Sequence, residues 1–227
     1  MRRALTITLG AWLVVGAALS AADFWEEQPF TEWSDKDVQK MLSDSPWAQQ
    51  VRIALGSLSE DALPTGAQPS GPPEDCGGTQ FGGIQRHRLT VVWTSALPVK
   101  QALVRQASGL GGPVPAESQQ VLDQPEPLYA VTLFGIPPSL AVLGSMRDTL
   151  MSETELRRKD QEPIVPEDVR LFQNADDGMI RIIFLFPKTD LITLDDKDVE
   201  FVTRLVDSEV KKKFKLEDMA FQDQLEL

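Results

Sequence analysis

The chain has 227 residues, enough for one sizeable domain or two small domains with a hydrophobic core. It carries 34 acidic and 22 basic side chains, and the net charge of −12 repels the phosphate groups of nucleic acids and anionic lipids, so neither is expected as a partner. The single cysteine, Cys76, excludes an internal disulfide, so we expect burial alone to hold the fold together.

An export signal is predicted over residues 1–22. Two arginines precede an apolar run from Ala4 to Ala18, and small residues stand before the predicted cleavage between Ala22 and Asp23. The alternative is an uncleaved membrane anchor, because the apolar run up to Ala22 approaches the roughly 18 to 20 residues that span a bilayer. After cleavage we expect an exported, soluble protein, periplasmic or extracellular, that makes no membrane contact.

Residues 23–55 are predicted to form an aromatic arm, a short helix and a first strand. Trp25, Trp33 and Trp47 follow one another closely in this region. The favoured interpretation is that they pack the arm onto the body of the protein. The alternative is an exposed aromatic patch that binds a partner or ligand.

Two patterns within this region predict its secondary structure. Ser34 followed by Asp37 has the spacing of a capping box, with aspartate in place of the usual glutamate, so a helix is expected to begin there. That helix is expected to end at Ser45-Pro46. From Gln49 to Leu55 apolar residues alternate with others, which is typical of a half-buried strand.

Residues 56–83 are rich in glycine and proline and are predicted to form a flexible loop. They contain almost no large apolar side chains, so burial cannot offset the entropy lost on ordering them. Alternation resumes from His87 to Trp93 and predicts a second strand, which pairs antiparallel with the first across the loop.

Residues 84–160 are predicted to form a strand–helix–strand–helix region. Ser95 is expected to cap a helix with Pro98 in its first turn. A strand is predicted over Leu128–Phe134, and Pro137-Pro138 is expected to begin a second helix. The apolar stripe of that helix comprises Leu140, Leu143, Met146 and Leu150.

Residues 161–227 are predicted to be rich in strands and to pack on the same core. Turn chemistry at Asn174–Gly178 and at Asp207-Ser208 predicts two hairpins. The strands expected are Val169–Phe172, Met179–Phe186, Val199–Val206, Glu209–Leu216 and, more weakly patterned, Met219–Leu227. The whole pattern predicts an α+β fold: a mixed β-sheet with two or three covering helices and a β-rich C-terminal third.

No catalytic, metal-binding or cofactor-binding motif is identified, and no cofactor is expected. His87, the only histidine, is expected to be a structural or surface residue, because nothing holds it near the thiol of Cys76 as nucleophilic catalysis requires. One acidic cluster suggests either a calcium site or a solvated turn with capping acids. This cluster comprises Asp195, Asp196, Asp198 and Glu200.

Three motifs resemble a family of uncharacterised secreted bacterial proteins. They are Trp33-Ser34 with Asp44-Ser45-Pro46-Trp47-Ala48, then Trp93-Thr94-Ser95-Ala96-Leu97-Pro98-Val99, and the ending Phe214-Lys215-Leu216-Glu217-Asp218-Met219 with Leu225-Glu226-Leu227. The resemblance implies an exported single-unit protein and assigns no catalytic residue.

From these patterns we expect a non-catalytic binding or protein-interaction module of the cell envelope or exterior, with an envelope or extracellular protein as its partner. The alternative is a secreted hydrolase that uses carboxylates alone and acts on glycans, because the 34 acids provide pairs whose approach the sequence does not reveal. A cleft holding two acids about 5 to 10 Å apart would favour the hydrolase.

Overall fold

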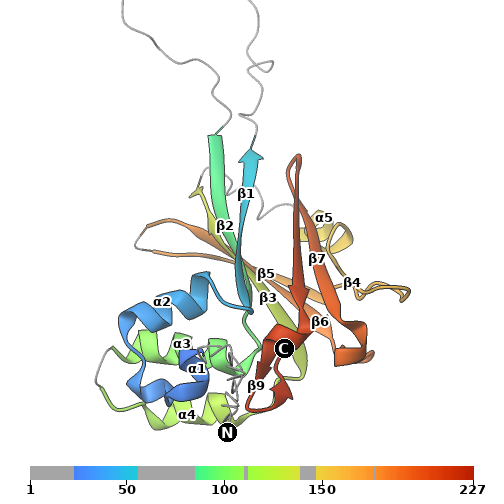
Figure 1. The fold of residues 1–227 in the computed structure, drawn as a ribbon. Helices are drawn as coiled ribbons and strands as arrows, with labels where there is room; N and C mark the ends of the chain where they lie inside the picture. The colour runs from blue at the N-terminus through green and yellow to red at the C-terminus, as the bar shows by residue number, and fades with distance from the viewer. Residues whose placement is uncertain (1–22, 56–84, 110–111, 139–146, 176) are drawn as a thin grey trace, which may run out of the picture.

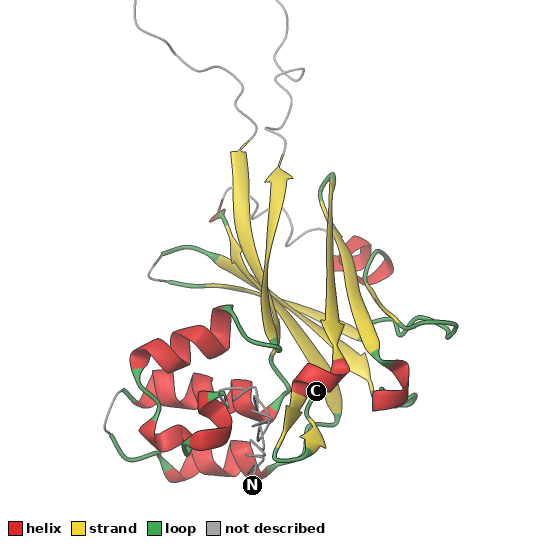
Figure 2. Cartoon of the chain, viewed as in Figure 1, coloured by secondary structure: helices red, strands yellow, loops and turns green. Residues whose placement is uncertain are grey.

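Two β-sheets pack against each other in the computed structural model, and most of the helices gather at one end of them (Figure 1 and Figure 2). The structure describes residues 23–55, 85–109, 112–138, 147–175 and 177–227. Within these ranges the buried hydrophobic side chains form one continuous cluster, which extends from the N-terminal arm to the C-terminal segment.

The larger sheet has five strands in the order β1-β2-β3-β6-β5, and each neighbouring pair is antiparallel. Its strands are β1 (Ala48–Leu55), β2 (Gln85–Trp93), β3 (Leu128–Ile136), β5 (Asp168–Gln173) and β6 (Ile180–Pro187). The predicted pairing of the first two strands across residues 56–83 is confirmed, as is the predicted β5–β6 hairpin.

The smaller sheet has the order β4-β7-β8 and is also antiparallel. Its strands are β4 (Glu155–Arg157), β7 (Asp198–Leu205) and β8 (Ser208–Lys215), and a separate pair consists of β9 (Ala220–Phe221) and β10 (Gln224–Leu225). The predicted β7–β8 hairpin is confirmed, although its two-residue turn is Val206-Asp207, one residue earlier than expected. The weakly patterned C-terminal strand is divided by a turn at Gln222-Asp223, where both residues have positive φ.

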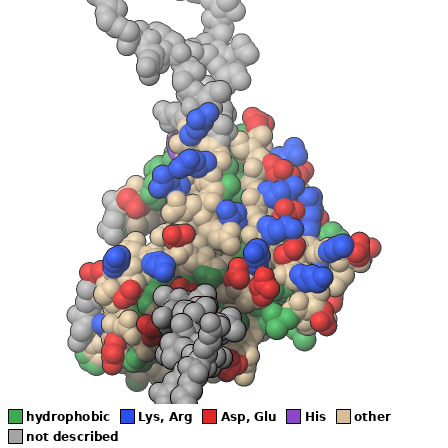
Figure 3. All heavy atoms as spheres, viewed as in Figure 1, with side chains coloured by type: hydrophobic (Ala, Val, Ile, Leu, Met, Phe, Trp, Pro, Cys, Tyr) green, Lys and Arg blue, Asp and Glu red, His purple; other side chains and the backbone are tan. Residues whose placement is uncertain are grey.

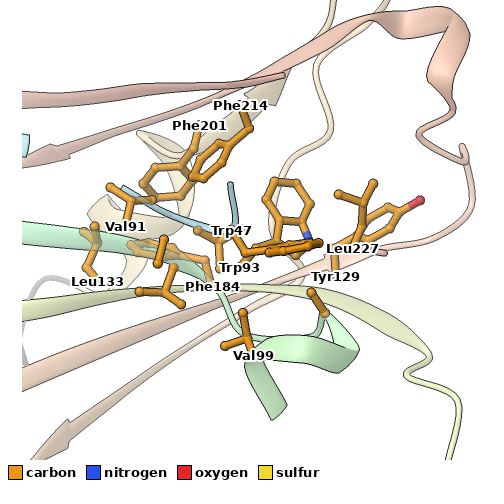
Figure 4. Packing of buried hydrophobic residues seen from close by; sticks show 14 of the residues in the cluster. Trp47, Val91, Trp93, Val99, Tyr129, Leu133, Phe184, Phe201, Phe214 and Leu227 are labelled. Atoms are coloured by element: carbon orange, nitrogen blue, oxygen red, sulfur yellow. The ribbon is translucent and has the colours of Figure 1, made fainter. Parts of the chain in front are cut away.

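Aromatic side chains fill the space between the two sheets (Figure 4). The ring of Phe184 on β6 lies 5.4 Å from that of Phe201 on β7. The ring of Trp93 on β2 lies 5.7 Å from that of Phe214 on β8. Both contacts are edge-to-face, a geometry that aromatic pairs favour. The two inner faces are therefore joined by large side chains that alternate along each strand with outward-facing residues.

The helices begin and end with recognisable local chemistry. The α-helices are α1 (Phe24–Glu27), α2 (Asp35–Ser43), α3 (Leu97–Ser108), α4 (Ala116–Asp123) and α5 (Arg147–Ser152). The 3₁₀-helices are η1 (Phe30–Glu32), η4 (Leu194–Asp196) and η5 (Leu216–Met219). The capping box predicted for α2 is confirmed, because Asp37 N–H donates to Ser34 Oγ and the Asp37 carboxylate accepts from Ser34 N–H. Helices α1 to α4 lie together at one end of the sheets, whereas α5 lies beside β5 and β7 (Figure 1).

The α+β class and the β-rich C-terminal third are confirmed. The sheets are antiparallel where a mixed sheet was expected, because α3 and α4 stay at one end of the sheet instead of crossing its face. The chain consequently returns along β3 in the direction opposite to β2. Neither α4 nor β4 was predicted.

Several predicted features lie outside the described residues. They are the export signal 1–22 with Ala22, the loop 56–83 with Cys76, and the part of the predicted second helix at residues 139–146. Leu150, the last residue of that predicted stripe, is buried on α5. In the part of the chain that the structure describes, no helix has the length and apolar character needed to cross a bilayer.

Candidate functional site

The three N-terminal tryptophans are buried, so the packing interpretation is confirmed and the exposed aromatic patch is wrong. Trp25, Trp33 and Trp47 expose 6%, 1% and 0% of their surface. The ring of Trp25 lies 5.7 Å from that of Trp47, whose Nε1 donates to the carbonyl of Glu226 at 2.8 Å. Since a buried indole contributes a large apolar area and satisfies its N–H, these residues hold the arm to the C-terminal segment.

The acidic cluster of the sequence is engaged in capping and ion pairs. The Asp196 carboxylate caps η4 by accepting from Thr193 N–H at 2.8 Å. The Asp198 carboxylate accepts from Lys213 at 2.9 Å, across the β7–β8 hairpin. Among the described residues, no group of three or more histidine, cysteine or acidic side chains is gathered as metal ligands would be. The hypothesis of capping acids therefore accounts for these carboxylates.

His87 lies on the inner face of β2, opposite Ile53 of β1, and is half-buried. Its position follows the strand alternation, as a structural histidine requires.

A groove of about 740 Å³ lies between the helical end of the molecule and the C-terminal segment. Its walls are the first turn of α3, the end of α4 with the loop that follows, the start of β3, the loop after β6, and the last three residues. Its lining residues include Lys100, Leu122, Glu126, Tyr129, Lys188, Leu191, Leu194 and Glu226. We refer to this site as the groove.

Two hydrogen bonds fix the start of α3 in the wall of the groove. Ser95 was expected to cap this helix, but it does not. Its Oγ instead accepts from Ala130 N–H at 3.0 Å and so fastens the segment to β3. The Glu226 carboxylate instead accepts from Leu97 N–H at 3.3 Å. A carboxylate stabilises the first turn of a helix because the backbone N–H groups there have no partner within the helix.

Lys100 joins α3 to the loop after α4. Its Nζ lies 3.1 Å from a carboxylate oxygen of Glu126, and the backbone carbonyls of Val121 and Gln124 accept from it at 3.5 and 3.4 Å. This lysine is consequently committed to holding two walls of the groove together.

Lys188 is a different kind of cation. Its Nζ lies 4.8 Å from the centre of the Tyr129 ring, and no carboxylate oxygen of the described residues comes within 4.0 Å. Burial lowers the pKa of its ammonium below the ordinary value, while the charges of Glu126 and Glu226 act in the opposite direction. The ammonium therefore stays available to a ligand in the groove.

Tyr129 supplies a phenol beside this lysine. Its Oη accepts from Ile192 N–H at 2.9 Å, which holds the loop after β6 against the start of β3. Burial raises the pKa of the phenol, although the hydrogen bond from Ile192 opposes the change. The hydroxyl thus keeps its proton and can donate a hydrogen bond into the groove.

Exposed apolar side chains stand at the rim of the groove. Leu191 and Leu194 line it and expose 61% and 55% of their surface, and Val121, next to the lining residue Leu122, exposes 53%. In the described residues the other exposed large hydrophobic side chains are Val165, at 60%, and Phe172, at 43%. The groove thus combines an apolar rim with one unpaired cation and one hydroxyl donor.

Sequence analysis did not identify the groove. Many of its residues come from loops and from α4, where no helical or strand period marks them, and they meet the lining residues of α3 and β3 only in the folded protein. One signal was present, namely two leucines, Leu191 and Leu194, in a short segment that continues no strand alternation.

Comparisons of the chain with protein families, with curated proteins and with solved structures find no match. The resemblance of the three sequence motifs to secreted bacterial proteins stays a prediction. Function is therefore inferred from the groove itself.

Proposed function

We propose that the protein is an exported binding module of the cell envelope or exterior, and that its groove takes apolar side chains of a protein partner. The observation that carries this proposal is that Leu191 and Leu194, two of the most exposed large hydrophobic side chains in the described residues, both line the groove. Single exposed apolar residues are ordinary on protein surfaces, but their concentration around a concave site is typical of binding sites.

The groove also offers polar groups that can orient a bound segment. The Lys188 ammonium lies over the Tyr129 ring, and both it and the Tyr129 hydroxyl can donate a hydrogen bond to a backbone carbonyl or a carboxylate of the partner. A few placed polar groups within an apolar lining are what gives such sites their specificity.

Selection of random peptides displayed on phage tests the binding hypothesis. The wild-type protein should enrich peptides that share an apolar motif, and the double variant Leu191→Ser/Leu194→Ser should lower their binding at least tenfold, because it removes the rim. Val165→Ser is the matched control, since Val165 exposes 60% of its surface and does not line the groove. Equal enrichment on the wild type and the double variant, or none on either, would contradict the proposal.

Export is tested separately. N-terminal sequencing of the protein recovered from outside the cytoplasm should begin at Asp23, after cleavage behind Ala22. A retained leader would indicate the membrane anchor instead.

A carboxylate-dependent hydrolase acting on glycans is the second candidate function, because Glu126 and Glu226 line the same groove. Both carboxylates already have partners, Lys100 and Leu97 N–H, which favours a structural role for them. Turnover of a polysaccharide panel by the wild type, lost in both Glu126→Gln and Glu226→Gln, would establish the hydrolase. No turnover would remove it.

A further inference from the structure

Three arginines gather on the outer face of the β1–β2 hairpin. In the strand register Arg52 of β1 lies directly opposite Arg88 of β2, and Arg86 lies two residues from Arg88 on the same face. All three side chains are exposed. We call this set, Arg52, Arg86 and Arg88, the arginine face.

No acid compensates these cations within the described residues. None of the three guanidinium groups has a carboxylate oxygen within 4.0 Å there. Lys212 of β8 adds a further positive charge at the adjacent seam, because its Nζ donates to the carbonyl of Gln50 on β1 at 3.1 Å. The space-filling view shows blue side chains over β1 and β2 without red neighbours between them (Figure 3).

The β7–β8 hairpin of the same molecule has the opposite arrangement. Its outward-facing lysines lie opposite or diagonal to acids: Lys213 lies 2.9 Å from Asp198, and Lys211 lies 4.0 Å from Glu200. Figure 3 accordingly shows blue and red side chains interleaved over this hairpin. Within the described residues, three arginines without a carboxylate partner on one face therefore set β1–β2 apart from β7–β8, in a protein whose net charge is −12.

Like charges directly opposite on two strands destabilise the pair, and an acidic protein has many carboxylates with which to avoid this cost. The register of Arg52 and Arg88 thus opposes stability without any compensation in the described fold. Features that lower stability and have no compensating interaction in the fold concentrate at functional sites.

We propose that the arginine face docks an extended, acidic peptide segment of a partner protein. Side chains two residues apart on a strand lie roughly 6.6 Å apart, so Arg86 and Arg88 match the spacing of alternating acids in an extended peptide. Guanidinium groups bind carboxylates through paired N–H donors, which makes arginine well suited to this recognition. This site is separate from the groove, and its failure would leave the proposed function of the groove unaffected.

Fluorescence anisotropy with a labelled ten-residue peptide of alternating Glu and Thr tests the proposal. The wild type should bind this peptide and should not bind the matched peptide of alternating Lys and Thr. The double variant Arg52→Gln/Arg88→Gln should bind about tenfold more weakly, because it removes two charge-assisted contacts. Its melting temperature should be equal to or above that of the wild type, which shows that the variant is folded.

The matched control is Lys211→Gln/Lys213→Gln, which removes the same charge from the compensated hairpin and should change the affinity less than twofold. Three outcomes would overturn the proposal: no binding of the acidic peptide, an equal loss in the control variant, or binding to vesicles containing phosphatidylglycerol that depends on the arginines while peptide binding does not. The last outcome would assign the face to a membrane surface.

Discussion

The β1–β2 and β7–β8 hairpins share one construction on their inner faces and differ on their outer faces. Inside, both supply buried apolar residues to the cluster between the sheets, for example Ile53 from β1 and Phe214 from β8. Outside, β7–β8 places Glu200 opposite Lys213, whereas β1–β2 places Arg52 opposite Arg88.

This difference separates two demands on one fold. The inner faces of both hairpins must pack in the core, so both carry buried apolar side chains. An outer face that balances its charges serves stability and solubility, and one that does not balance them is available for recognition. The predictions that follow test this distinction, first on the inner faces and then on the outer ones.

Phe214→Ala tests the inner face with the largest expected effect. Phe214 is fully buried against Trp93, so the variant should lose about 3 to 5 kcal/mol of unfolding free energy, through lost burial and the cavity left behind. Ile53→Val, on the inner face of β1, should lose only about 0.5 to 1.5 kcal/mol. Urea unfolding measures both, and a loss below about 1 kcal/mol for Phe214→Ala would contradict the packing of the two sheets.

Val206→Gly tests the turn that joins β7 to β8. Val206 has φ of +55°, a region that β-branched residues rarely adopt, and it is the first of the two turn residues, where a type II′ turn favours glycine. The variant should gain about 0.5 to 1 kcal/mol, because relief of strain exceeds the added entropy of glycine in the unfolded chain. The control Asp207→Gly, at a position without positive φ, should lose stability; a loss at Val206 as well would show that no strain is present.

Arg88→Gln and Lys213→Gln compare the two outer faces directly. The first removes one member of a like-charged pair and should raise the melting temperature by about 1 to 3 °C. The second removes a cation whose pKa the hydrogen bond with Asp198 raises, and should lower the melting temperature slightly. Differential scanning calorimetry at low salt measures both shifts. If the two shifts have the same sign, the distinction between the hairpins does not hold.

The smallest expected effect is the pH dependence of stability that Lys188 contributes in the groove. Like the arginines of β1–β2, Lys188 has no carboxylate partner within 4.0 Å among the described residues. Its pKa is lowered in the folded protein, so between that pKa and the ordinary lysine value of about 10.4 the unfolded chain binds more protons. Stability should therefore rise with pH in this range, and Lys188→Met should reduce the rise.

Melting temperatures of the wild type and Lys188→Met at pH 7.5, 8.5 and 9.5 measure this contribution. The range ends below pH 10 because the raised pKa of Tyr129 adds a loss of stability where unfolded tyrosine ionises. Identical pH profiles would show that the groove does not perturb Lys188.

Elements set by neighbouring residues were predictable from the sequence. The spacing of Ser34 and Asp37 predicted the start of α2, because a capping box depends on four consecutive residues. Alternation and turn chemistry predicted the β7–β8 hairpin, because a strand shows its burial directly in the sequence.

Features that depend on distant residues were not predictable. Helix α4 has a single buried side chain, Leu122, so no apolar period marks it. The groove forms only when the loop after β6 meets the C-terminal segment. Arg52 and Arg88 lie opposite each other only through the pairing of β1 with β2, two strands that residues 56–84 separate in the sequence. The tryptophans were correctly favoured as packing residues, but their contact with Glu226 could not be foreseen.

The hydrogen bond from Trp47 to the carbonyl of Glu226 joins positions 179 residues apart. The indole N–H cannot make this bond until residue 226 is present, because its acceptor is the carbonyl of that residue. Contacts of such long sequence separation slow folding, because a large loop must close before they form. We therefore expect the Trp47–Glu226 contact to form late in folding, after segments from both ends of the described chain have come together.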